Sequence, residues 1–206
     1  MLVRASRDGD QFQYLWAARR CFRLLSPSTG LVAVTIEGAS SIKFPAGEAV
    51  AAGEELIDVG EYYGSQDVTQ ATLVRYIQLK HSTLHANDPW VPSGLQTTLG
   101  KFAQRYAEIR NRLGATILVG KLEFWFVSNR PVATDVLKAI EDAAGEAPAR
   151  HPSERTKLKE LVGLDGPDFV GFCKLLRMEV GQEGYWAQRS LLFQDVRGYP
   201  LAKLLR

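Results

Sequence analysis

The order of hydrophobic periodicities along the chain restricts the fold more than any other sequence feature. Apolar residues recur at helical spacing after Asp10 and stop at Pro27, so we expect a helix from about Gln11 to Leu25. Three segments with the two-residue alternation of strands follow it: Val32 to Glu37, Glu55 to Tyr63, and Leu73 to about Ser82. The N-terminal part therefore predicts one helix followed by a small sheet.

The remainder of the chain contributes a long helix, one further strand and several helical segments. Between Pro92 and Gly114, apolar residues fall at three- and four-residue intervals, which predicts an amphipathic helix. The nearly continuous apolar run from Lys121 to Asn129 predicts a strand covered on both faces. The later periodic segments all favour helices: Thr134–Ala144, Ser153–Val162, Asp168–Val180 and Glu183–Arg206. We therefore expect an α/β core over residues 1–131 and an α-helical extension over 132–206.

Composition restricts the class of protein but indicates no function. A chain of 206 residues with 46% apolar residues can bury a sizeable core. The N-terminus lacks the apolar stretch of a signal peptide, and no apolar run approaches the length of a bilayer. Cys21 and Cys173 both fall in helical apolar patterns, which favours reduced thiols and a cytoplasmic location. The net charge of +2 is too small to indicate nucleic-acid binding by itself.

Four polar residues are placed on the predicted strands as a site for phosphodiester hydrolysis requires. Glu37 ends the first strand and Asp58 lies inside the second, while Gln78 and Lys80 point to one side of the third. A hard cation such as Mg²⁺ prefers oxygen ligands, which the two carboxylates and the Gln78 amide could supply. Lys80 could position the water and offset developing charge. The alternative is an Asp58–Lys80 salt bridge, with Glu37 as a solvated acid at a strand end.

These residues and their order resemble the PD-(D/E)xK nucleases, in the variant where Gln replaces the last acid. The resemblance extends to the DNA endonuclease domains of bacterial anti-phage effectors, of the CBASS and Avs-like kinds. Their recurring elements correspond here to Gly9–Gln13, Glu37, Ile57-Asp58 and Gln78-Leu-Lys80-His81-Ser82. Val59 follows Asp58, where many of these nucleases carry a second acid. The likeness covers about the first 130 residues.

The resemblance implies a fold, a cofactor and a substrate. It implies a restriction-endonuclease-like core with Glu37, Asp58, Gln78 and Lys80 as catalytic residues, the first three of them binding Mg²⁺ or Mn²⁺. Gln13 would have an auxiliary role, although with Asp10 it also fits a helix capping box. The substrate would be double-stranded DNA, cut with little sequence specificity, and a downstream sensor or NTPase domain would follow the helical extension.

Basic residues on the predicted helices are the candidates for contact with DNA. They are Lys101, Arg105, Arg19 and Arg23, together with His81 after the third strand. Lys101 and Arg105 are four residues apart and share a helix face, so both could grip phosphate oxygens without reading the base sequence. A solvated helix face explains these charges equally well, and a histidine after a strand is more often a surface residue.

Three alternatives remain open at the level of sequence. The core could act on RNA, belong to a restriction system, or be a non-catalytic assembly module that retains the fold. The C-terminal helical pattern carries an apolar stripe that needs a partner: Trp186, Leu191, Leu192, Val196, Leu201 and Leu205. We therefore expect the active protein to be a homo-oligomer, because one site hydrolyses one strand at a time.

Overall fold

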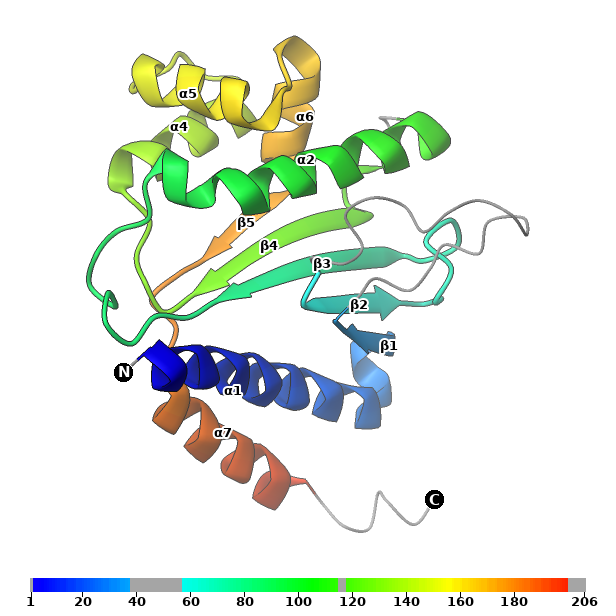
Figure 1. The fold of residues 1–206 in the computed structure, drawn as a ribbon. Helices are drawn as coiled ribbons and strands as arrows, with labels where there is room; N and C mark the ends of the chain where they lie inside the picture. The colour runs from blue at the N-terminus through cyan, green and yellow to red at the C-terminus, as the bar shows by residue number, and fades with distance from the viewer. Residues whose placement is uncertain (1, 38–56, 115–117, 200–206) are drawn as a thin grey trace.

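The centre of the molecule is a five-stranded mixed sheet with strand order β1-β2-β3-β4-β5 (Figure 1). The computed structural model describes residues 2–37, 57–114 and 118–199. The strands are β1 (Leu31–Ile36), β2 (Val59–Tyr63), β3 (Leu73–Lys80), β4 (Leu122–Ser128) and β5 (Leu176–Glu179). β1, β2 and β3 pair antiparallel, whereas β3, β4 and β5 are parallel. The protein is thus a mixed α/β fold, as the sequence predicted.

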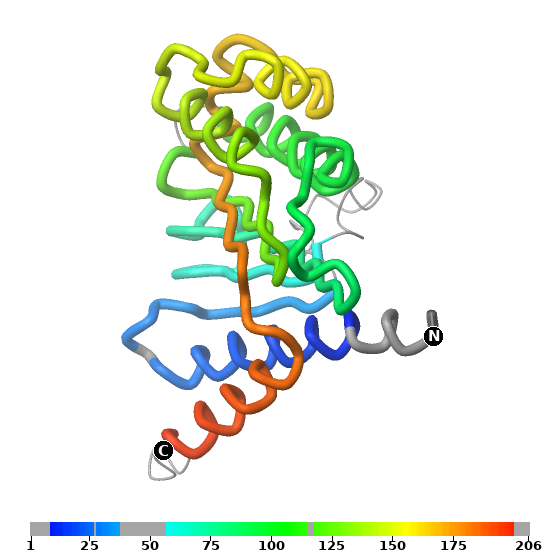
Figure 2. Tube along the Cα trace, turned by 90° about the vertical axis from the view of Figure 1, so that its left-hand side faces the viewer, coloured from blue at the N-terminus to red at the C-terminus, as the bar shows by residue number. Residues whose placement is uncertain are grey.

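Helices cover both faces of this sheet (Figures 1 and 2). One face carries α2 (Pro92–Leu113), α4 (Thr134–Ala144), α5 (Pro152–Val162) and α6 (Gly166–Leu175). The other face carries α1 (Leu2–Cys21), which continues into the short 3₁₀ helices η1 (Phe22–Leu25) and η2 (Pro27–Thr29), and α7 (Tyr185–Gly198), which packs on α1. Among the described helices, none is long and apolar enough to cross a membrane.

The interior strand β4 contributes side chains to both apolar clusters of the core. Phe124 and Phe126 belong to the larger cluster, which fills the space beneath α2, α4 and α6. Val127 belongs to the smaller cluster, in which Phe12 and Trp16 of α1 pack on the sheet, and Trp125 packs against it. The prediction that this strand is covered on both faces is confirmed, since side chains on both of its faces pack in an apolar cluster, although Glu123 and Trp125 on the α1 side stay partly exposed.

The first helix and the second strand have different bounds from those predicted. α1 begins at Leu2, nine residues before the predicted start at Gln11, and its regular α-helical part ends at Cys21. β2 begins at Val59, so Asp58 precedes the strand and does not lie inside it. The strand start predicted at Glu55 lies outside the described residues.

The predicted helix over Asp168–Val180 is wrong in its second half. The helix α6 ends at Leu175, and residues Leu176–Glu179 form β5 at the edge of the sheet. Leu176 is opposite Phe124 of β4 and is buried, whereas Arg177 is exposed. Pairing with the free edge of β4 outweighs the helical spacing of these residues, because the unpaired backbone groups of that edge need partners. The segment after residue 131 is therefore not purely helical and completes the sheet of the core.

The C-terminal helix packs less tightly than its apolar stripe predicted. Gln188 is the only residue of α7 that is buried, whereas Leu191 and Leu192 are partly buried. Trp186 is 70% exposed and Val196 is 46% exposed. The last members of the stripe, Leu201 and Leu205, lie outside the described residues, and self-association stays a prediction.

Candidate functional site

The antiparallel register brings three of the predicted site residues into one row across β1, β2 and β3. Both antiparallel ladders end at Val59, the first residue of β2. The residue before it, Asp58, therefore lies between Glu37, which follows β1, and Gln78 of β3. The backbone N–H of Glu37 donates to the carbonyl oxygen of Asp58 at 2.8 Å, so the row extends one step beyond the ladder. Asp58 thus lies next to residues 21 positions before it and 20 positions after it in the sequence, because the strands pair in this register.

The carboxylate of Asp58 is held against β3 by two hydrogen bonds. Its Oδ2 accepts from the side-chain amide of Gln78 and from the backbone N–H of Leu79, both at 2.6 Å. Burial raises the pKa of Asp58 to about 6, and the nearby charge of Glu37 acts in the same direction. The Leu79 N–H and the positive charge of Lys80 oppose this rise. Such a half-buried acid beside a second carboxylate favours a cation as its neighbour.

The backbone of Glu37 is strained, and its side chain is exposed but anchored. Its φ is +55°, in the left-handed region that residues with a Cβ seldom adopt. The phenol of Tyr14, on α1, donates to Oε1 of Glu37 at 2.6 Å. This hydrogen bond, together with the charge of Glu37, raises the pKa of Tyr14, since the phenol stays protonated as the donor. A left-handed turn at the end of β1 thus directs Glu37 to a residue of the covering helix.

Tyr14 is a site residue that the sequence pattern did not single out. The resemblance selected its neighbour Gln13, which is half-buried and forms no hydrogen bond within the described ranges. Adjacent residues of a helix point about 100° apart, so only one of the two can reach the end of β1. A tyrosine that is 52% exposed on a helix that packs on the sheet through Phe12 and Trp16 is a signal of a polar partner, but it can be seen only once the burial of these residues is known.

Lys80 lies two residues beyond Gln78, at the end of β3. The alternation of the strand places both on the side that carries Tyr76, which packs beneath α2. The Lys80 side chain is exposed and forms no ion pair in the part of the chain that the structure describes. Its charge is nevertheless close enough to lower the pKa of Asp58. Gln78 and Lys80 thus lie on one face of β3, as predicted, and Lys80 forms no salt bridge with Asp58.

The free oxygens of this row suit a hard divalent cation. Oδ2 of Asp58 and Oε1 of Glu37 accept the hydrogen bonds described above, which leaves Oδ1 and Oε2 without hydrogen bonds from the described residues. Gln78 donates through its nitrogen, so its amide oxygen remains an acceptor. Across residues 2–37, 57–114 and 118–199, no group of three or more His, Cys, Asp and Glu side chains is placed to hold a metal ion. The row offers two carboxylates and one amide oxygen instead, which are ligand types that Mg²⁺ and Mn²⁺ prefer.

The predicted DNA contacts do not form one surface, and for Arg105 the prediction is wrong. Arg105 is 1% exposed, and its guanidinium lies over the ring of Tyr76 beneath α2, so it serves the core. Lys101, one turn before it on α2, is half-buried. Arg19 is occupied by Asp195 and Gln188 of α7. The side chains that were expected to grip phosphate are thus spread over both layers of helices.

The two remaining candidates lie on the α1 side of the sheet. The ring of His81 stacks on Phe12 of α1, with centroids 4.8 Å apart. Arg23, in η1, lines a cavity between α1 and the sheet. Neither is on the side of β3 that carries Gln78 and Lys80, although His81 follows Lys80 directly in the chain.

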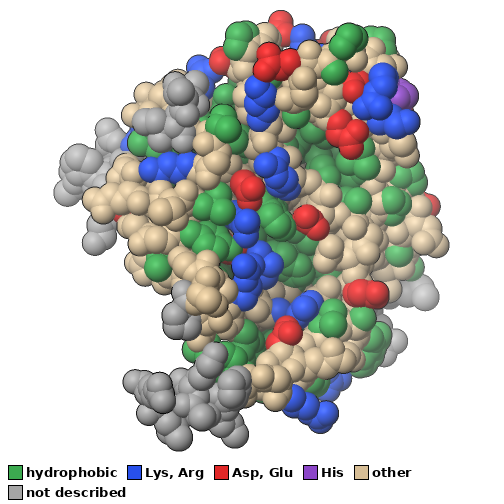
Figure 3. Space-filling model, turned by 180° about the vertical axis from the view of Figure 1, so that it is seen from behind, with side chains coloured by type: hydrophobic (Ala, Val, Ile, Leu, Met, Phe, Trp, Pro, Cys, Tyr) green, Lys and Arg blue, Asp and Glu red, His purple; other side chains and the backbone are tan. Residues whose placement is uncertain are grey.

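A second charged cluster, not predicted from the sequence, lies on the α1 side of the sheet. Glu61 of β2 is fully buried and binds the guanidinium of Arg20 of α1 at 2.5 Å and 3.0 Å. Arg75 of β3 lies 3.5 Å from Glu61 and 2.7 Å from Glu123 of β4. Figure 3 shows basic and acidic side chains close together down the middle of the molecule as seen from behind. This cluster ties α1 to three strands.

The architecture and the row of site residues define the chain as a mixed α/β protein with a polar site at the end of its antiparallel strands. No protein-family model and no curated protein matches the sequence.

Proposed function

We propose that the protein is a metal-dependent endonuclease that hydrolyses phosphodiester bonds of double-stranded DNA. The observation that carries the proposal is the row of Glu37, Asp58 and Gln78 across three paired strands, with Lys80 on the same side of β3. Two carboxylates, one amide oxygen and one free ammonium at the end of a sheet are the groups that phosphodiester hydrolysis requires. A structural salt bridge would instead have paired Lys80 with Asp58.

In this proposal each side chain has one task. A divalent cation, when bound, polarises the phosphate and lowers the pKa of a water. Asp58, Glu37 and Gln78 supply its oxygen ligands, and the hydrogen bonds from Leu79 and Tyr14 fix the orientation of the two carboxylates. The ammonium of Lys80 is exposed, so it is free to orient the attacking water and to stabilise negative charge on the phosphate.

The substrate class and the biological role rest on the sequence resemblance. The same four residues in the same order occur in the DNA endonuclease domains of anti-phage effectors, so we assign double-stranded DNA as the substrate and host defence as the role.

Plasmid cleavage with matched variants tests the proposal. The wild-type protein should nick and linearise supercoiled plasmid in Mg²⁺ or Mn²⁺ and lose this activity in excess EDTA. Asp58→Asn and Lys80→Ala should each lower cleavage at least about a hundredfold, because the first removes a charged oxygen ligand of the cation and the second removes the ammonium that stabilises charge on the phosphate. Glu160→Gln and Lys157→Ala, both exposed on α5, are the matched controls and should cleave like the wild type.

Parallel assays with single-stranded DNA and RNA identify the substrate. Cleavage of RNA alone would reassign the substrate while keeping the site. Metal-dependent cleavage that survives both Asp58→Asn and Lys80→Ala would place the reaction elsewhere in the molecule, and the lack of cleavage on any nucleic acid would favour the assembly module.

A further inference from the structure

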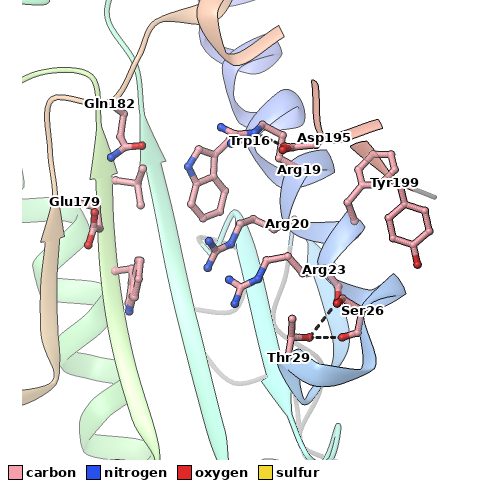
Figure 4. Close-up of a pocket in the computed structure, with 13 residues that line it drawn as sticks. Trp16, Arg19, Arg20, Arg23, Ser26, Thr29, Glu179, Gln182, Asp195 and Tyr199 are labelled. Carbon is pink, nitrogen blue, oxygen red and sulfur yellow. Dashed lines mark hydrogen bonds and ion pairs between the residues drawn. The ribbon is translucent and has the colours of Figure 1, made fainter. Parts of the chain in front are cut away.

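A cavity of about 600 Å³ lies on the α1 side of the sheet, away from the row of site residues (Figure 4). Its walls come from α1 and η1, from β4, from the segment between β5 and α7, and from α7 itself. Segments that are far apart in the sequence therefore close it. The volume is within the usual range for small-molecule sites.

One wall of the cavity is basic. Arg20 and Arg23 point into it side by side (Figure 4). Arg20 is neutralised by Glu61, whereas Arg23 is half-buried and forms no ion pair with any residue in the described ranges. The carbonyl oxygen of Arg23 accepts hydrogen bonds from the hydroxyl of Thr29 and from the backbone N–H of Ser26, both at 3.1 Å. The backbone that carries this uncompensated guanidinium is thus fixed.

The floor of the cavity is aromatic. Trp16 of α1 and Trp125 of β4 line it, together with Phe22 and Val127. The guanidinium of Arg20 lies 5.0 Å from the ring centre of Trp16 and 5.8 Å from that of Trp125, which orients both rings next to the basic wall. Flat indole rings beside guanidinium groups suit a ligand that combines a planar ring with an anion.

The opposite wall carries acceptors and donors of a different kind. Figure 4 shows Glu179 and Gln182 across the cavity from Arg20 and Arg23. The backbone N–H of Gln182 donates to Ser128 at 3.0 Å, which holds this segment against the end of β4. Glu179 forms no ion pair within the described residues. A carboxylate and an amide at this position can bind hydroxyl and amino groups at the other end of a ligand.

We propose that this cavity is a binding site for a nucleoside monophosphate group, with its phosphate on Arg23, its base against Trp16 and Trp125, and its donor groups on Glu179 and Gln182. The group can be a free nucleotide or the 5′-phosphorylated end of a strand, since both present the same chemistry. The site lies on the opposite face of the sheet from Gln78 and Lys80, and it does not depend on the proposed nuclease activity.

Isothermal titration calorimetry on the full chain tests the site without any activity measurement. The probes are AMP and CMP, with adenosine and inorganic phosphate as the ligands that lack one half of the group. The two mononucleotides should bind, and each half alone should bind at least about tenfold more weakly, because both contacts contribute to affinity. Quenching of the fluorescence of Trp16 and Trp125 should accompany binding.

Variants locate the site. Arg23→Ala should weaken mononucleotide binding by about tenfold or more, since a charge-assisted contact to phosphate is lost. Arg23→Lys, which keeps the charge, should recover part of the affinity, and Arg197→Ala, an exposed arginine of α7 outside the cavity, should leave it unchanged. A 5′-phosphorylated trinucleotide, compared with AMP, shows whether a free nucleotide or a strand end is preferred.

Three results would overturn the proposal. They are no binding of either mononucleotide at millimolar concentration, binding that Arg23→Ala leaves intact, and equal affinity for inorganic phosphate and AMP. Thermal unfolding of Arg23→Ala in the absence of ligand shows that the variant is folded, so that a loss of binding cannot be attributed to misfolding.

Discussion

At the scale of single residues, the candidate site depends on what holds its two acids. Asp58 takes both of its hydrogen bonds from β3, whereas Glu37 is held by a side chain of α1 and by a strained backbone. Two carboxylates anchored from different layers would bind one cation more tightly when both anchors hold them in place. The hydroxyl of Tyr14 is therefore the contact by which the helix on one face of the sheet supports a site at the end of its strands.

We expect Tyr14→Phe to weaken metal binding while leaving the fold unchanged. Loss of one hydrogen bond to an exposed carboxylate should raise the Mn²⁺ dissociation constant by less than about tenfold, and cleavage should recover at saturating metal. Direct titration of Mn²⁺ by calorimetry measures this effect. Gln13→Ala is the matched control, because it removes the neighbouring polar side chain. If both variants raise the dissociation constant equally, Tyr14 has no specific role in holding Glu37.

At the scale of elements, the charged cluster around Glu61 determines how α1 sits on the sheet. Burial opposes the ionisation of Glu61, but the hydrogen bonds and charges of Arg20, Tyr63 and Arg75 outweigh it and lower the pKa of this acid below its ordinary value of 4.5. An acid whose pKa is lowered by folding stabilises the folded state at every pH above the pKa that the acid has in the unfolded chain. This contribution is lost as the pH falls through the lower, folded pKa.

The Glu61→Gln variant should therefore be destabilised in a pH-dependent way. At pH 7 we expect a loss of about 3 kcal/mol in the free energy of unfolding, because two arginines lose the buried charge that they share. The difference from the wild type should shrink as the pH falls below the ordinary value of 4.5 towards the lower, folded pKa of Glu61, because the wild-type acid then becomes protonated too. Urea unfolding at pH 7 and at a series of pH values below 4.5 measures it. A difference that is constant with pH would mean that the charge of Glu61 has no part in holding α1.

At the scale of the whole molecule, the residues after 131 share a core and a sheet with the residues before them. The larger apolar cluster includes Phe169 and Phe172 of α6 and Val136 of α4, packed together with Phe124 of β4. β5 covers the edge of β4. The segment after residue 131 thus supplies part of the core and one edge of the sheet, while α7 packs on α1 across the other face.

A chain that ends at Pro131 should therefore fail to fold. It would expose the apolar face of β4 and leave the edge of that strand unpaired, which favours aggregation. We expect insoluble protein or a chain without cooperative thermal unfolding, whereas residues 1–199 should unfold cooperatively. Circular dichroism during heating is the measurement. A soluble chain of 131 residues with a sharp unfolding transition would restore the boundary predicted from the sequence.

The sequence by itself determined the elements whose periodicity is long or strongly apolar. The spacing of apolar residues predicted α2 and α4 almost to the residue, and the continuous apolar run of β4 predicted its coverage on both faces. The sequence also placed Gln78 and Lys80 on one side of β3, because alternation along a strand is a local property. These predictions needed no knowledge of what each element packs against.

Only the tertiary structure decided which distant residues meet. The register of β1, β2 and β3 brings Asp58 between Glu37 and Gln78, and the packing of α1 chooses Tyr14 and not Gln13 as the partner of Glu37. Pairing with β4 turned Leu176–Glu179 into a strand, and burial beneath α2 removed Arg105 from the surface. Each of these outcomes depends on contacts between elements far apart in the chain. The free energy of such contacts cannot be predicted from the periodicity of a single segment.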